Sequence, residues 1–318
     1  MKYFSKNKII TTIFLIAFFY ALFTLYSDYE KIGVIYERVN WHFLLPIFGI
    51  LFFTVFVRSI IQRFLLQNIG IHVTIKDSFL IFLSGLSMII TPGGSGVLVK
   101  SYFIQKKFGH SAAKSLPIVF VERFFELIGV VILLFVTLFF VYTNESLIVA
   151  MVASAIILGL LYLVRGEKPH NFLVKLLKKV KPFHKIVEDT ELFESMKKLF
   201  RLKVIVFMTI VVTLVTFLEA FMFYFGFLAF GVDLGYFESI QTFYTSILFG
   251  SLFFIPGGVG ATEGLFAALL TQKNIELSLA TSIILFLRLS TIWLVTGVGF
   301  FVAYFTFIRN KESPKNNT

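Results

Sequence analysis

The sequence "TPGGSGVLVKSYF", residues 91–103, interrupts a long apolar run with one proline and three glycines. Both residue types are poor helix formers, and proline also removes a backbone hydrogen bond. The same interruption returns in "IPGGVGATEGLF", residues 255–266, so Pro92 and Pro256 each begin a Pro-Gly-Gly-x-Gly motif. Two matching breaks in apolar segments predict two corresponding elements of the fold.

The composition predicts an α-helical membrane protein with several spans. Of the 318 residues, 58% are hydrophobic and 15% are charged, and the mean hydropathy is +0.89. Soluble domains average about 25% charged residues. The 43 phenylalanines are interpreted as lipid-facing, and the absence of cysteine excludes disulfides and thiolate metal ligands. Six apolar segments are long enough to cross a hydrocarbon core of about 30 Å, namely residues 9–26, 41–66, 117–142, 146–165, 204–230 and 279–307.

The two broken runs, 79–103 and 239–270, are each either one kinked span or a re-entrant hairpin of two half-helices. The loop 165–203 holds 11 Lys and Arg, so the positive-inside rule places it in the cytoplasm. With both runs as hairpins, 24 of the 29 Lys and Arg are cytoplasmic, including those in residues 58–78 and 100–116. A crossing first run would put the lysines of 100–116 on the side opposite that loop. The charge distribution therefore favours hairpins.

An internal repeat accompanies the breaks. Arg123 follows Pro92 by 31 residues, and Arg288 follows Pro256 by 32. Three predicted spans separate the hairpins, so the first would open to the cytoplasm and the second to the outside. We therefore predict an all-α polytopic membrane protein with about six full spans and two re-entrant half-helix hairpins in an inverted-topology repeat. Many secondary transporters use this architecture.

The chain is expected to divide at the basic loop. Residues 1–165 form the first membrane half, 166–203 a basic amphipathic cytoplasmic loop, 204–308 the second membrane half and 309–318 a disordered tail. Both termini are expected in the cytoplasm, with the protein in the plasma membrane. The lysines of the loop flank spans and alternate with apolar residues, which favours contact with anionic lipid over nucleic acid.

The breaks themselves predict a binding site. Irregular backbone at membrane depth is tolerated only where protein or a water-filled cavity surrounds it. Glycine allows close backbone approach, and the helix that starts after each tip presents N–H groups and a positive dipole end to an anion. A hairpin that packs without a ligand is the alternative. The candidate substrate-binding residues at the tips are Gly93, Gly94, Ser95, Gly96, Gly257, Gly258 and Gly260.

Charged residues in apolar segments are the other candidates, because burial of a charge in a membrane is costly unless the charge is paired or hydrated. Arg123 and Glu126 are spaced to pair on one helix face, and Glu263 is the expected partner of Arg288. An arginine near a helix N-terminus suits phosphate in a fork geometry. Lys100 either reaches a headgroup or snorkels to the surface. The charged candidates are Lys100, Glu122, Arg123, Glu126, Glu263 and Arg288, and Glu219 is a further charge within a predicted span. For all of these except Lys100, structural salt bridges are the alternative.

Catalysis is not expected. The five histidines are scattered, and no cluster of His, Cys and Asp has metal-ligand spacing. Nucleophile-elbow, P-loop and dinucleotide motifs are absent from the sequence. We therefore expect no enzymatic activity, no catalytic residue, no metal and no cofactor.

The paired motifs, with "PIVFVERFFELIG" after the first and "LFLRLSTIWLVTG" after the second, resemble the lysylphosphatidylglycerol synthase transmembrane region family, also described as flippase-like or UPF0104. The resemblance covers about residues 9–308. Family members include the membrane part of proteins that aminoacylate phosphatidylglycerol and move the product between leaflets. The resemblance points to the tip residues and to Glu122, Arg123, Glu263 and Arg288. It departs at Val97, where family members often carry an acid, and we expect no aminoacyl-transferase activity.

The resemblance and the motifs together predict a flippase-like protein. It would bind or translocate an anionic phospholipid or polyprenyl-linked headgroup through a central cavity. One alternative is a non-transporting subunit that supports a glycosyltransferase or aminoacyl-lipid synthase through the basic loop. Another is a secondary transporter of a small soluble solute.

Overall fold

The structure is a computed structural model that describes residues 29–89, 96–165, 190–252 and 258–308, and every regular element in these ranges is helical. Four helical stretches in the described chain are long and apolar enough to cross a membrane: Trp41–Asn68, Asn144–Leu163, Leu202–Ala229 and Leu277–Thr306. They match four of the predicted spans. The predicted span 9–26, most of the basic loop and the tail 309–318 lie outside the described residues.

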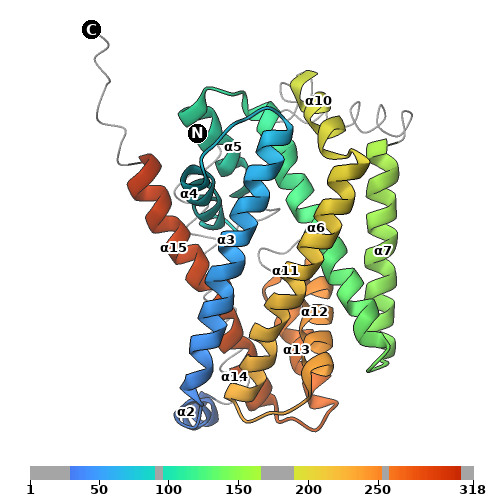
Figure 1. Cartoon of the computed structure of the whole chain (residues 1–318). Coiled ribbons are helices and arrows are strands. Elements are labelled where there is room, and N and C mark those ends of the chain that lie inside the picture. The colour runs from blue at the N-terminus through green and yellow to red at the C-terminus, as the bar shows by residue number, and fades with distance from the viewer. Residues whose placement is uncertain (1–28, 90–95, 166–189, 253–257, 309–318) are drawn as a thin grey trace.

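Four long helices run the length of the bundle (Figure 1). They are α3 (Leu44–Asn68), α6 (Ala112–Leu138), α7 (Asn144–Arg165) and α11 (Leu202–Ala229). A short 3₁₀ turn, η1 (Trp41–Phe43), leads into α3.

The helix α6 corresponds to the predicted span 117–142 but begins earlier. Ser111 is its N-cap, and the Ser111 hydroxyl accepts a hydrogen bond of 3.2 Å from the N–H of Lys114. Such a cap satisfies one of the free N–H groups of the first turn. Glu122, Arg123 and Glu126 stand near the middle of α6. Glu122 is buried inside the bundle, whereas the side chain of Arg123 is half-exposed.

Each broken run forms two helices that pack against each other. The first pair is α4 (Ile75–Leu86) and α5 (Gly96–Phe108), and the second is α12 (Tyr236–Leu252) and α13 (Ala261–Thr271). The first pair lies in the upper part of the bundle and the second in the lower part (Figure 1). At 12 and 13 residues, α4 and α5 are each about 18–20 Å long, well short of a full hydrocarbon core.

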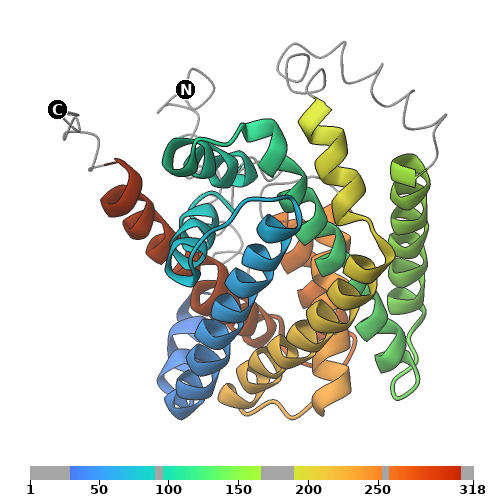
Figure 2. The ribbon, with the colours of Figure 1, turned by 45° about the horizontal axis from the view of Figure 1, so that its top comes forward.

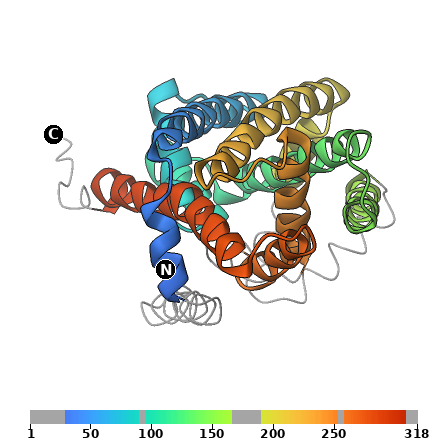
Figure 3. The same cartoon turned by 90° about the horizontal axis from the view of Figure 1, so that it is seen from below.

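The last predicted span is a helix with two π-helical segments. It begins as α14 (Leu277–Arg288), passes through η4 (Leu289–Trp293) and α15 (Leu294–Ala303), and ends in η5 (Tyr304–Ile308). The short helix α2 (Tyr29–Glu37) packs against α14, and both are visible from below (Figure 3). The amphipathic helix α10 (Thr190–Leu199) packs against α6 at the opposite end (Figure 2).

The phenylalanines do not all face outward. Several are exposed, as predicted, but four aromatic rings are wholly buried between the helices: Phe125, Phe227, Phe243 and Phe266. Burial of these large rings stabilises the bundle by close packing, which is the main attraction between helices where lipid replaces water. A close contact also joins α15 to α4, where a Cβ on Gly299 would lie 2.4 Å from the carbonyl oxygen of Leu83. The glycine therefore sets the approach of these two helices.

Candidate functional site

A cavity of about 270 Å³ lies between α3, α4, α6, α11, α12 and the η4–α15 segment, and we name it the central cavity. Its wall has a charged part and an apolar part. The charged and polar part includes Arg58, Arg123, Glu126, Glu219, Tyr244, Thr54 and Thr291. The apolar part comprises Leu51, Val55, Phe82, Leu86, Ile89, Met222, Phe223, Phe243, Ile247, Ile292 and Val295.

Arg58 on α3 organises the charged wall. Its Nε and Nη2 donate to the two carboxylate oxygens of Glu219 on α11, each over 2.7 Å. Its Nη1 donates to Oε1 of Glu126 on α6, also over 2.7 Å. A bidentate guanidinium–carboxylate pair of this kind is strong and fixes the geometry of both groups. Arg58 thus joins three long helices at the cavity.

Glu126 is shared between two arginines. Its second oxygen, Oε2, accepts a hydrogen bond of 2.6 Å from Nη1 of Arg123, three residues earlier on α6. This confirms the predicted pairing of Arg123 with Glu126. The side chain of Arg123 remains 49% exposed, and its other N–H groups make no hydrogen bond to the described residues. It therefore presents a free edge of guanidinium at the cavity wall.

The four charges of the central cavity balance. Arg58 and Arg123 carry two positive charges, and Glu126 and Glu219 carry two negative charges. Only Arg123 leaves donors unsatisfied within the part of the chain described. The cavity is thus neutral overall, with one local site suited to an oxyanion.

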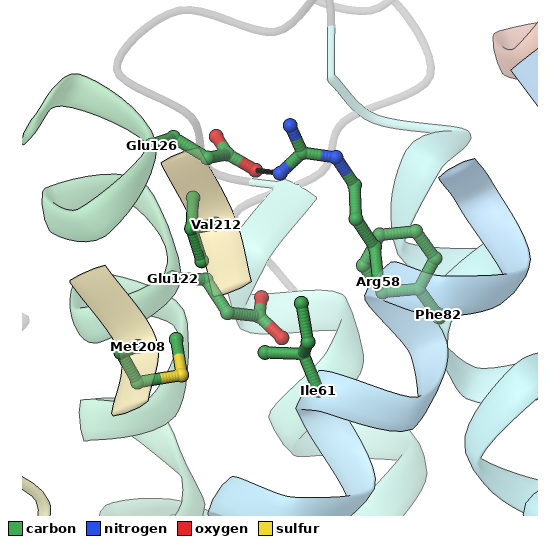
Figure 4. A pocket seen from close by; sticks show the side chains of 7 residues that line it. All are labelled: Arg58, Ile61, Phe82, Glu122, Glu126, Met208 and Val212. Atoms are coloured by element: carbon green, nitrogen blue, oxygen red, sulfur yellow. Dashed lines mark hydrogen bonds and ion pairs between the residues drawn. The ribbon is translucent and has the colours of Figure 1, made fainter. Parts of the chain in front are cut away.

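A second, much smaller cavity lies beside the central cavity, and Figure 4 shows the side chains that line it. Its volume is about 10 Å³, which is close to the smallest space that holds one water molecule. It is lined by Arg58, Ile61, Phe82, Glu122, Glu126, Met208 and Val212. Three of these residues, Arg58, Phe82 and Glu126, also line the central cavity. The small cavity therefore connects the charged wall to the buried side chain of Glu122.

Lys100 and Glu122 form a buried ion pair between α5 and α6. The Lys100 Nζ lies 2.6 Å from Oε2 of Glu122, and the two residues are only 5% and 8% exposed. The ammonium also lies 4.2 Å from the centre of the Phe82 ring, which adds a cation–π contact. The lysine chain runs over Gly85, where an added Cβ would come within 2.5 Å of it. Of the two predictions for Lys100, snorkelling to the surface is wrong, because the side chain points inward.

Glu263 and Arg288 form the corresponding pair between α13 and α14. The Arg288 Nε donates to Oε1 of Glu263 over 3.0 Å, and the residues are 3% and 1% exposed. The other oxygen of Glu263 accepts a hydrogen bond of 2.7 Å from the N–H of Gly260 at the start of α13. The predicted partnership of Arg288 and Glu263 is confirmed. The Nη2 of Arg288 is buried and has no hydrogen-bond partner among the described residues.

The tip residues are described only in part. Gly93, Gly94, Ser95 and Gly257 lie outside the described residues, and Gly96 is the first residue of α5. Gly258 and Gly260 both have positive φ, at 68° and 88°, as a tight turn before α13 requires. A Cβ on Gly258 would also lie 2.6 Å from Oγ1 of Thr262. The conformational role predicted for these two glycines is thus confirmed.

The predicted charged residues do not all converge. Arg123 and Glu126 line the central cavity, and Glu122 lines the small cavity next to it. The Glu263–Arg288 pair lies outside both cavity linings, so Arg123 and Arg288 do not form one phosphate site in this structure. Among the described residues, no group of His, Asp and Glu is arranged to hold a metal ion.

Arg58 and Tyr244 are cavity residues that the predicted candidates omit, whereas Glu219 is one of the predicted intramembrane charges. The charge count placed Arg58 in a cytoplasmic segment, residues 58–78; this is wrong for Arg58, which lies within α3 and lines the cavity. The signal was available, because Arg58 falls inside the predicted apolar span 41–66. An ionisable residue within a span is a functional candidate by default.

Comparison with known proteins gives one family. The sequence model of the lysylphosphatidylglycerol synthase TM region matches residues 9–299. A UPF0104 membrane protein of Methanocaldococcus jannaschii is 25% identical over 231 residues, which cover 71% of this chain and 97% of that protein. A UPF0104 membrane protein of Pyrococcus horikoshii is 27% identical over 259 residues, which cover 73% of this chain and 76% of that protein. The resemblance recognised from the paired motifs is confirmed.

Proposed function

Because the chain belongs to the lysylphosphatidylglycerol synthase transmembrane region family, we propose that it handles lipids within the membrane as a flippase-like protein. The headgroup of an anionic phospholipid or of a polyprenyl-linked lipid enters the central cavity, while the acyl or prenyl chains stay in the bilayer. The protein moves the headgroup between leaflets and catalyses no chemical reaction.

The amphipathic wall of the central cavity carries this proposal. A headgroup needs polar contacts, and the first carbons of the chains need apolar ones. Arg123 offers free guanidinium donors for a phosphate, with Arg58 and Glu219 fixed beside it. The opposite wall, which includes Phe223, Phe243 and other apolar side chains, suits the glycerol and chain region. A small soluble solute would leave this apolar surface without a function.

The proposal includes the inverted repeat. The helix pairs α4–α5 and α12–α13 occupy opposite parts of the bundle, as hairpins that open to opposite sides would (Figure 1). Each pair also sends one buried charge from its second helix to the next long helix: Lys100 to Glu122, and Glu263 to Arg288. On this proposal both pairs are re-entrant, the termini are cytoplasmic and the protein lies in the plasma membrane.

The basic segment 166–203 is assigned to the anionic cytoplasmic surface. Attraction of lysines near a membrane to anionic lipid is about 1 kcal/mol per residue. The same segment is the surface through which a glycosyltransferase or aminoacyl-lipid synthase would bind, if the protein also serves as a partner of such an enzyme.

A reconstituted lipid-movement assay tests the proposal. Purified protein is placed in vesicles that contain a headgroup-labelled fluorescent phosphatidylglycerol, and the outer-leaflet probe is quenched with dithionite. We expect quenching of inner-leaflet probe to proceed in vesicles with the wild-type protein and to slow at least tenfold with Arg123→Gln. Lys31→Met, which alters an exposed ion pair far from the cavity lining, serves as the matched control and keeps the wild-type rate.

Two other results would redirect the assignment. Absence of movement, together with co-purification of a lipid-modifying enzyme, would favour the supporting-subunit role. Flux of a soluble solute without movement of lipid would favour a solute transporter. Equal rates for wild type and Arg123→Gln would remove the cavity from the mechanism even if lipid moves.

A further inference from the structure

The carboxylate of Glu122 is only half satisfied. Its Oε2 is paired with Lys100 at 2.6 Å, whereas its Oε1 is buried and has no hydrogen-bond partner among the described residues. The residue as a whole is 8% exposed. A buried charged oxygen without a hydrogen bond is costly, because it has lost its hydration without replacement. A proton or a water molecule at Oε1 would remove that cost.

The small cavity supplies the space for a water molecule beside Glu122. Glu122 lines it, and its volume of about 10 Å³ accommodates about one water molecule (Figure 4). A water there has the Glu122 carboxylate on one side and the Arg58–Glu126 pair on the other. Since Arg58 and Glu126 also line the central cavity, a water in the small cavity would lie next to the charged wall of that larger space.

The charges around Glu122 determine the net charge that results when its carboxylate is neutralised. Among the described residues, the charged and titratable groups around Glu122 and the two cavities are Lys100 on α5, Arg123 and Glu126 on α6, Arg58 on α3, Glu219 on α11 and Tyr244 on α12. The Arg58–Glu219–Glu126–Arg123 group has no net charge, and neither has the Lys100–Glu122 pair. Neutralisation of Glu122 alone therefore leaves one positive charge, that of Lys100, beside the cavity.

We propose that Glu122 is a proton-binding site that couples proton uptake to the binding of an anionic lipid headgroup. A water in the small cavity transfers a proton to Oε1, where an O–H bond forms, and the hydroxide that remains is reprotonated through water in the central cavity by a proton from the bulk solution. The carboxylate becomes a neutral acid, and the Lys100 ammonium keeps its charge. These charged groups together then carry one positive charge, which a phosphate with one negative charge balances.

This inference rests on the proposed function, since it needs a headgroup in the central cavity. The coupling is reciprocal: the proton strengthens binding of the anion, and the anion strengthens binding of the proton by the same factor. Lys100 does not line the central cavity, but its ammonium lies over the ring of Phe82, which does. Its charge therefore attracts an anion in the cavity across that ring, in a region of low dielectric where charges interact strongly. Proton and anionic headgroup would accordingly move together, so a proton gradient would drive the lipid in the same direction.

Isothermal titration calorimetry of the full-length protein in detergent tests the coupling, with a water-soluble short-chain phosphatidylglycerol as the probe. Titrations in two buffers of different ionisation enthalpy count the protons taken up. We expect about one proton per lipid bound, and a Kd that falls by up to about tenfold for each unit by which the pH falls. Binding that takes up no proton and shows no dependence on pH would overturn the proposal.

Variants test whether Glu122, and no other acid, takes up the proton. Glu122→Gln is expected to bind the probe without proton uptake and with the same Kd at every pH. The double variant Lys100→Met with Glu122→Gln avoids an unpaired buried lysine, and it should fold and also lose the proton uptake. Glu276→Gln is the matched control, because it alters an acid that is also paired with a lysine but is exposed; its proton uptake should equal that of wild type. Undiminished uptake in both Glu122 variants would contradict the assignment.

An infrared pH titration without lipid keeps the two proposals distinguishable. As the pH is lowered, the wild-type protein should gain the C=O band of a protonated carboxylic acid that Glu122→Gln lacks at the same pH. If the short-chain lipid does not bind at any pH, the cavity function fails, while this band still decides the proton site. If the band is identical in both proteins, Glu122 does not titrate, and the proton site is wrong whether or not lipid binds.

Discussion

Arg288 and Glu263 form an ion pair of 3.0 Å in which both side chains are almost wholly buried, at 4% and 2% exposure. The pair joins the second helix of the α12–α13 pair to the long helix that follows it. Lys100 and Glu122 join α5 to α6 in the same way, but with the charges exchanged: the base is on the short helix in the first half and on the long helix in the second. Both halves of the chain therefore fasten a short helix to the bundle by a buried ion pair.

Removal of one partner should be far more damaging than removal of both. Arg288→Met leaves the Glu263 carboxylate buried without its counter-charge, and we expect a loss of about 3–5 kcal/mol in the free energy of unfolding. The double variant Arg288→Met with Glu263→Gln should recover most of that loss. Chemical unfolding in detergent, followed by circular dichroism, measures both. An equal loss for the single and double variants would mean that the charge pair is not the cause.

The exposed ion pair Lys31–Glu276, between α2 and the start of α14, is the control for the stability effect of the buried Arg288–Glu263 pair. A hydrogen bond from Lys31 lowers the pKa of the Glu276 carboxyl below its usual range. An acid with a lowered pKa stabilises the folded state above its unfolded pKa, and this contribution disappears as the pH falls through the folded value. Since both side chains are about 60% exposed, Lys31→Met should change stability much less than Arg288→Met does. The small change should vanish in acid.

The turn before α13 should tolerate no side chain at Gly258. Its φ of 68° is strained for other residues, and a Cβ would collide with Oγ1 of Thr262 at 2.6 Å. We expect Gly258→Ala to destabilise the protein by about 1–3 kcal/mol. Gly264→Ala is the matched control, because it lies on the same helix with open space around it, and it should stabilise by about 0.5–1 kcal/mol. Thermal unfolding ranks the two; the reverse order would contradict the turn geometry.

The sequence predicted those ion pairs whose two residues are close in sequence. It also predicted ion pairs between charges that stand alone in neighbouring apolar segments. Arg123 with Glu126 and Arg288 with Glu263 are of this kind. Arg58 was missed because its partner Glu219 lies 161 residues away, and no local pattern indicates which of several helices will face α3. Its charge was instead assigned to the cytoplasmic end of the span.

The inward direction of Lys100 was equally hidden from the sequence. A lysine one turn from a helix start can extend toward water or toward the bundle, and the choice depends on space in a neighbouring helix. Here Gly85 on α4 leaves a channel for the lysine chain, which ends at Glu122. The existence of the helix pairs followed from the Pro-Gly-Gly breaks. The central cavity depends on six helical segments packed together, and the sequence predicted its presence but only a few of its lining residues, such as Arg123 and Glu126.

Membrane topology can be tested on single cysteines, since the chain has none of its own. Gln105, Asn144 and Gln272 are exposed at or near helix ends, and Glu194 is exposed on the short helix α10. If the hairpins are re-entrant, Gln105→Cys and Glu194→Cys should react with a membrane-impermeant maleimide only from the cytoplasm, and Asn144→Cys and Gln272→Cys only from outside. Reaction of Gln105→Cys and Glu194→Cys from opposite sides would show that the first broken run crosses the membrane.

The neutrality of the central cavity gives a prediction of opposite sign for two nearly isosteric changes. Glu126→Gln leaves the cavity with one extra positive charge and frees Arg123 from its partner, so an anionic headgroup should bind more tightly. Arg123→Gln leaves one extra negative charge and removes the free donors, so the same headgroup should bind more weakly. We expect the Kd for short-chain phosphatidylglycerol to shift by about tenfold in each direction, or ~1.4 kcal/mol. Zwitterionic short-chain phosphatidylcholine should show a much smaller shift, because it carries no net charge.

Lipid movement should not follow affinity in these two variants. A headgroup held more tightly by Glu126→Gln leaves the cavity more slowly, so transport should fall even as binding improves. In Arg123→Gln both should fall together. The comparison separates a charge effect from general damage to the fold, since damage would weaken binding in both proteins. If both variants weaken binding of phosphatidylglycerol and phosphatidylcholine alike, the Arg123–Glu126 pair only stabilises the structure of α6 at the cavity and does not bind the headgroup.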